Sequence, residues 1–194
     1  MIEKLKTLFK RKETTIWDLP VANKEKIDDK IADFIISQAD KALAYSLDVA
    51  DKTTNRAYAV ILIMTPITST AISLLVKEIT EKQQIRNPYK IGLYEFLTIL
   101  CVSALILLLT IVLPRLTMGS GREPKNIAHD HMLQNENSFK RNLLLIKLNE
   151  IKNLQYKISY NDELNDKRVF RFKLSLLIIC IGFLGGAIIY AMLE

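Results

Sequence analysis

The sequence lacks charged residues over three long stretches. No Asp, Glu, Lys or Arg occurs in Ala57–Val76, Phe96–Leu113 or Leu174–Leu193, which cover 20, 18 and 20 residues. Because a helix rises ~1.5 Å per residue, about 20 apolar residues cross the ~30 Å hydrocarbon core of a bilayer. Three such stretches in a chain of 194 residues argue against a soluble helical core. We therefore expect three membrane-spanning helices, the second of which can start at Ile91 if Glu95 is tolerated near the interface.

The sequence also lacks the motifs of an enzyme. It contains no glycine-rich phosphate loop, no serine nucleophile elbow and no HExxH zinc-protease motif. The only two cysteines, Cys101 and Cys180, fall within the expected spans and form neither a disulfide framework nor a zinc-ligand spacing. The "HDH" of residues 129–131 is weak evidence of a metal site, and we expect a solvated loop there. We expect no catalytic residue, no metal and no resident cofactor.

Lys and Arg are unevenly distributed around the expected spans. Residues 1–56 carry 11 of them, 114–173 carry 12 and 77–91 carry 4, which accounts for all 27. Since cytoplasmic flanks hold the positive excess, we expect a cytoplasmic N-terminus and a periplasmic C-terminus. The net charge of +6 then indicates segments beside acidic lipid or a phosphate-bearing ligand rather than duplex nucleic acid.

The N-terminal stretch "MIEKLKTLFKRKE" has no apolar core or cleavage site, so we do not expect a signal peptide. Its apolar residues alternate with basic ones at helical spacing, which fits either a helix on an anionic membrane surface or a frayed, solvated terminus. After Pro20, Asn23 can cap a helix that starts near Lys24. No Gly or Pro interrupts this helix before Pro66, and apolar residues recur along it at spacings of three and four.

A second amphipathic helix is expected to start near Ser138. Its apolar residues lie close to heptad spacing, and "SYNDELNDK" can kink it but holds no Pro or Gly, so it can continue into the third span. The predicted fold is all-α, with three transmembrane helices whose long cytoplasmic extensions form a stalk, assembled as an oligomer. The expected segments are a basic membrane-surface segment (1–22), a cytoplasmic helix (23–56), the first span (57–76), an outer loop (77–90), the second span (91–113), a linker (114–137), a cytoplasmic helix (138–173) and the third span (174–193).

The stretch "TPITSTAIS", residues 65–73, places polar side chains inside the first span. Thr65, Ser69 and Ser73 fall within ~80° of one another on a helix. Such hydroxyls either hydrogen-bond across a helix interface or line a water path. Three spans cannot enclose a pore alone, so a pore lined by these three residues requires a homo-oligomer, such as a tetramer. We predict that they line a pore and that Pro66 acts in its gating, because proline frees backbone groups and kinks a helix.

Two further features lie in the expected spans. Glu95 is the only carboxylate near membrane depth, and it acts either in gating or simply meets headgroup water. Gly182 and Gly186 are four residues apart in "GFLGG", which predicts close packing of one helix on another.

Basic and aromatic residues recur on the second cytoplasmic helix. Lys140, Arg141 and Lys147 lie at helical spacing, and in a symmetric oligomer they would concentrate positive potential where phosphates bind. Tyr156 and Tyr160 can offer aromatic faces to bases. The five residues predict a nucleotide-binding site, and the alternative is a solvated basic face.

Two stretches together resemble a known family. "QADKALAYSLDVADKTTNRAYAVILI" leads into the first span, and "LNEIKNLQYKISYNDELNDKRVFRFKLSLLIICIGFL" leads into the last. Both resemble Pycsar-type transmembrane effectors of bacterial anti-phage defence, and they are similar to the Hailong effector, an ion channel controlled by a nucleotidyltransferase product. No fused cyclic-nucleotide-binding domain is visible.

The resemblance implies a multi-pass protein of the bacterial inner membrane. Its cytoplasmic part would sense a nucleotide second messenger or short oligonucleotide made by a nucleotidyltransferase or cyclase encoded nearby. Its membrane part would then depolarise the membrane, causing abortive infection. The alternative is a non-conducting adaptor whose cytoplasmic helices dock a partner.

Overall fold

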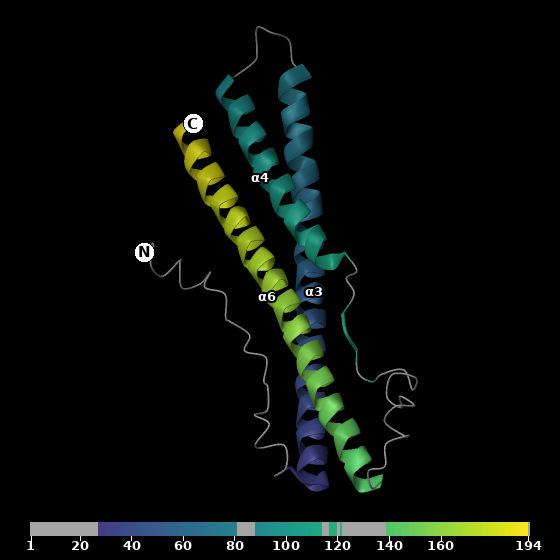
Figure 1. Ribbon diagram of the computed structural model, residues 1–194. Helices are drawn as coiled ribbons and strands as arrows, with labels where there is room; N and C mark the ends of the chain where they lie inside the picture. Colours follow the sequence, from purple (N-terminus) through teal and green to yellow (C-terminus); the bar gives the residue numbers. More distant parts are fainter. Residues whose placement is uncertain (1–26, 81–87, 114–116, 120, 122–138, 194) are drawn as a thin grey trace. The chain divides into compact units, whose positions relative to one another are not determined.

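The computed structural model describes residues 27–80, 88–113, 117–119, 121 and 139–193. Within these ranges all regular structure is helical, and no strand occurs. The predicted all-α class is therefore confirmed. The helices are α3 (Asp29–Thr80), α4 (Pro88–Val112) and α6 (Phe139–Leu193), with 52, 25 and 55 residues (Figure 1).

Each of the three helices contains a stretch long and apolar enough to cross a membrane, by length and composition. The most apolar windows have mean hydropathies of 2.1, 2.6 and 2.3, yet only 11%, 17% and 17% of them are buried within the chain. Apolar side chains in such numbers must be covered by lipid or by other protein. The prediction of three long apolar helices is confirmed, and they indicate a membrane protein.

Helix α3 begins where an aspartate caps it. The Ile31 N–H donates to Oδ1 of Asp28 over 2.7 Å, which is the bond that an N-cap side chain makes to the third helical residue. Residues 27 and 28 precede the helix, so the predicted start near Lys24 is wrong. The expected cap, Asn23, lies outside the described residues.

Helices α3 and α6 are continuous through the positions where a break was considered. Pro66 lies inside α3, where its missing N–H leaves the Leu62 carbonyl without its usual partner. The polar stretch "SYNDELNDK" lies inside α6 and does not end it. At ~1.5 Å per residue α3 and α6 are each about 80 Å long, against a hydrocarbon core of ~30 Å.

The chain divides into two compact units. Unit 1 comprises Met1–Ser46 and Met118–Asp162, and unit 2 comprises Leu47–Thr117 and Glu163–Glu194, so that α3 and α6 each contribute to both. Unit 1 has a small apolar core of Ile27, Ala32 and Ile151, with four half-buried apolar residues packed against it. Unit 2 has a small apolar core of Ala57, Leu108 and Ile111. Val60, Ile61, Val112 and Phe172 pack against it.

Candidate functional site

The hydroxyl residues predicted to line a pore lie on the exposed side of α3. Thr65, Ser69 and Ser73 are exposed, whereas Met64 and Ala71, toward the other side of the helix, are 3% and 9% exposed. Within the described part of the chain, these three hydroxyls therefore do not join α3 to another helix. They are available to lipid, to water or to another copy of the chain.

Two of these hydroxyls are already bonded to the backbone of α3 itself. The Thr65 hydroxyl donates to the Ile61 carbonyl over 2.8 Å, and the Ser73 hydroxyl donates to the Ser69 carbonyl over 2.9 Å. Such bonds satisfy the hydroxyl proton in an apolar environment and keep the side chain in a fixed rotamer. Neither hydroxyl therefore needs an acceptor from another helix.

Pro66 and Glu95, the two residues predicted to act in gating, are both exposed and lie on different helices. Pro66 follows Thr65 on α3, and Glu95 lies near the start of α4. No hydrogen bond or ion pair among the described residues joins them. A contact between the two residues therefore does not support their predicted roles in gating.

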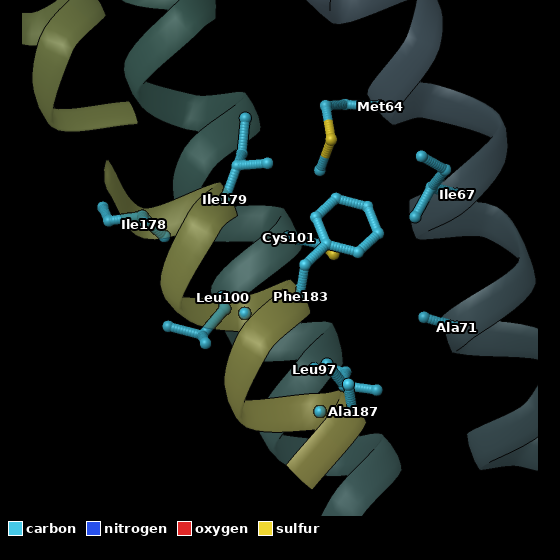
Figure 2. Close-up of a pocket in the computed structure, with 12 residues that line it drawn as sticks. Met64, Ile67, Ala71, Leu97, Leu100, Cys101, Ile178, Ile179, Phe183 and Ala187 are labelled. Atoms are coloured by element: carbon cyan, nitrogen blue, oxygen red, sulfur yellow. The ribbon is translucent and has the colours of Figure 1, made fainter. Parts of the chain in front are cut away.

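An apolar cavity of about 350 Å³ lies between α3, α4 and α6 in unit 2. Met64 of α3, Cys101 of α4 and Phe183 of α6 are among the residues that line it (Figure 2). Its walls carry no charged side chain, so the cavity suits an apolar occupant and not an ion. It lies toward the opposite side of α3 from the exposed hydroxyls, and it is not the proposed pore. This cavity was not predicted from the sequence.

The two glycines predicted to act in helix packing lie in α6 against leucines of α4. A Cβ added to Gly186 would lie 2.8 Å from Cδ2 of Leu97, and one added to Gly182 would lie 3.5 Å from Cδ1 of Leu100. The first distance is shorter than a carbon–carbon contact allows, so a larger residue at position 186 would force the Leu97 side chain to shift.

The residues predicted to bind a nucleotide are only partly brought together. Lys140 and Arg141 are exposed and line a groove of about 560 Å³ with Lys30 and Asp29. Lys147 does not line this groove. On the same helix Tyr156 is exposed and Tyr160 is half-buried, and neither lines the groove.

Lys147 instead makes two ion pairs inside unit 1. Its Nζ lies 2.7 Å from Oδ1 of Asp29 and 2.7 Å from Oδ1 of Asp33. The hydrogen bonds to Asp29 and Asp33 raise the pKa of Lys147 above its ordinary value. A phosphate at this position would have to compete with two carboxylates, so Lys140 and Arg141 are the more available cations.

Several buried polar residues of α6 were not identified from the sequence. Lys157, Asn161, Asn165 and Arg168 are 8%, 1%, 6% and 5% exposed. Their spacings of four, four and three residues are those of one helix face, which is the signal that could have revealed them. A polar face buried on a helix must find partners, and the first two residues find theirs in the segment after α4.

Lys157 and Asn161 hold that segment by its backbone. The Lys157 ammonium donates to the Gly119 carbonyl over 2.9 Å and to the Gly121 carbonyl. Gly121 has a φ of 83°, in the left-handed region that glycine adopts without strain. Asn161 bonds to both the N–H and the carbonyl of Met118.

Among known proteins, no family model, no curated sequence and no solved structure matches this chain. The function must therefore be argued from the arrangement of its own residues. The "HDH" of residues 129–131 lies outside the described residues.

Proposed function

We propose that this chain is a membrane effector of anti-phage defence that assembles into an oligomeric ion channel. The observation that carries the proposal is the exposure of Thr65, Ser69 and Ser73 on a candidate span. Hydroxyl groups that face hydrocarbon are not stabilised by it. When the same face is repeated around the axis of an oligomer, the hydroxyls form a polar path without the cost of a buried charge. Three spans for each chain and a continuous α3 support the same assembly.

A nucleotide signal is the proposed control. The groove lined by Lys30, Lys140 and Arg141 is rich in positive charge, which favours a phosphate-bearing ligand. The proposed ligand is a second messenger or short oligonucleotide made by a partner nucleotidyltransferase or cyclase. Its binding to unit 1 would act through α3, which continues from that unit to Pro66 and the hydroxyl face.

Ion flux from liposomes that contain only the purified chain tests conduction. We expect flux from the wild type, dependent on added nucleotide, and a several-fold reduction in Ser69→Leu, because leucine replaces the polar face by an apolar one. Thr70→Leu is the matched control, since Thr70 is also exposed but lies ~100° further around the helix. Equal loss in both variants would contradict a pore lined by Ser69.

The second candidate is a non-conducting adaptor. Phe34 and Tyr45, in the part of α3 that belongs to unit 1, are 65% and 70% exposed, which is typical of residues that contact a partner. Absence of flux from correctly inserted, oligomeric wild-type protein would favour this function over the channel.

A further inference from the structure

Unit 2 contains a second cavity, which is lined by one acidic and one basic residue that form no ion pair with each other. It has a volume of about 340 Å³. Helix α3 contributes Asp51 and Thr54, the segment after α4 contributes Thr117, and α6 contributes Arg168. Apolar residues, Ile111 among them, complete the wall. The cavity is therefore mixed in character, unlike the apolar one between the three helices.

Arg168 is the reason to expect a ligand here. The residue is only 5% exposed, and its Nε is buried without a hydrogen-bond partner. Asp51 lines the same cavity, yet no ion pair or hydrogen bond among the described residues joins it to Arg168. A buried guanidinium N–H without a hydrogen-bond partner is unfavourable, so the Arg168 Nε–H needs an anion or an equivalent acceptor.

The two charged residues lie just outside the uncharged stretches of their helices. Arg168 precedes the uncharged stretch that starts at Leu174 by six residues, and Asp51 precedes Ala57 by six residues. Six residues of helix correspond to about 9 Å. The headgroup layer is about 5–8 Å thick on each side of the hydrocarbon core. Both side chains can therefore reach the headgroup layer.

We propose that this cavity binds the headgroup of a phospholipid that carries both a phosphate and an ammonium group. The Arg168 guanidinium binds the phosphate through charge-assisted hydrogen bonds, and the Asp51 carboxylate binds the ammonium. The Thr54 hydroxyl donates to the Ala50 carbonyl over 2.9 Å, so toward the cavity it offers only an acceptor, which suits the ammonium. A ligand that is purely anionic fits less well because Asp51 repels it.

The proposal does not depend on conduction, since a non-conducting membrane protein would bind the same lipid. Native mass spectrometry of the full chain, supplied with equal amounts of phosphatidylethanolamine and phosphatidylglycerol, tests it. We expect preferential retention of phosphatidylethanolamine by the wild type. Arg168→Gln should weaken this retention about tenfold or more, the effect of losing charge-assisted hydrogen bonds. Asp51→Asn should abolish the preference between the two lipids.

Lys173→Gln is the matched control, because Lys173 is an exposed cation of the same helix and its loss should leave the preference unchanged. A second measurement, thermal unfolding of the wild type, does not depend on whether the variants fold. Phosphatidylethanolamine should raise the melting temperature of the wild type more than phosphatidylglycerol does. Equal stabilisation by the two lipids, or unchanged retention in a folded Arg168→Gln chain, would overturn the proposal. So would displacement of the lipid by soluble adenosine monophosphate, because it would make this a site for soluble phosphates.

Discussion

Asn161 of α6 pairs with the backbone of Met118 in both directions. The Met118 N–H donates to Oδ1 of Asn161 over 3.0 Å, and Nδ2 of Asn161 donates to the Met118 carbonyl over 2.9 Å. Nδ2 also lies 3.5 Å from Oγ of Ser46 on α3. One almost fully buried amide therefore connects three segments of unit 1, and its neighbour Lys157 holds the same backbone further along.

Replacing this amide by a carboxylate should destabilise unit 1. Asn161→Asp keeps the shape but removes the donor to Met118 and places a negative charge beside a carbonyl. We expect a loss of about 1–3 kcal/mol in the free energy of unfolding, the usual cost of an unmet buried hydrogen bond. Loss of helical circular dichroism on heating measures it. Asn142→Asp, at a half-buried position of α6 where the side chain makes no hydrogen bond within the described residues, should change little by comparison.

The ion pairs of Lys147 predict a stability that falls at alkaline pH. Asp29 and Asp33 raise the pKa of Lys147, so the folded chain holds this proton more tightly than the unfolded chain. The stabilisation that these ion pairs contribute is fully present below the ordinary pKa of lysine. It is lost as the pH rises through the raised pKa of Lys147. The difference in melting temperature between the wild type and Lys147→Gln should therefore shrink above about pH 10.5. A difference that stays constant from neutral to strongly alkaline pH would contradict this.

Charge reversal in the groove of unit 1 tests the nucleotide hypothesis. Arg141→Glu should weaken binding of a phosphate-bearing ligand tenfold or more and reduce its dependence on salt, because one phosphate contact is removed. Binding is measured by titration at two salt concentrations, with assembly checked by size. Lys152→Glu is the control, since Lys152 is exposed on the same helix but does not line the groove. Equal effects of the two variants would indicate that the overall positive potential of the helix, rather than a specific site, attracts the ligand.

The exposed hydroxyls predict a pattern of chemical labelling. In a background without Cys101 and Cys180, the variants Thr65→Cys, Ser69→Cys and Ser73→Cys should react with a water-soluble thiol reagent in the open state. Met64→Cys and Ala71→Cys should not, because they face the apolar cavity within the chain. Reaction at Met64→Cys and Ala71→Cys with none at the other three would place the water path elsewhere.

A bulky residue at Gly186 should loosen the contact of α6 with α4. Gly186→Ile places atoms where a Cβ alone already lies 2.8 Å from Leu97, and overpacking of this kind costs about 1–3 kcal/mol. Gly92→Ile is the matched control, because a Cβ at Gly92 meets nothing within 4 Å. The melting temperature should fall in Gly186→Ile relative to Gly92→Ile, and equal values would show that the contact contributes nothing.

The all-α fold class and the three apolar helices could be predicted because they depend on composition and periodicity along the chain. The start of α3 could not be placed, because Asn23 and Asp28 are both good caps and only the folded chain selects one. The partners of Lys147 and Asn161 could not be predicted either. Asp29 and Met118 are far from them in sequence, and contacts between distant segments leave no local pattern.

The hydrogen bonds of Thr65 and Ser73 to their own helix have a consequence for ion selectivity. Each hydroxyl has already donated its only proton to a carbonyl, so it presents oxygen lone pairs to its surroundings. Lone pairs coordinate cations and repel anions. In the proposed channel these residues would therefore form rings of partial negative charge, and the pathway would conduct cations in preference to anions. The reversal potential across a salt gradient should accordingly move toward the cation equilibrium potential.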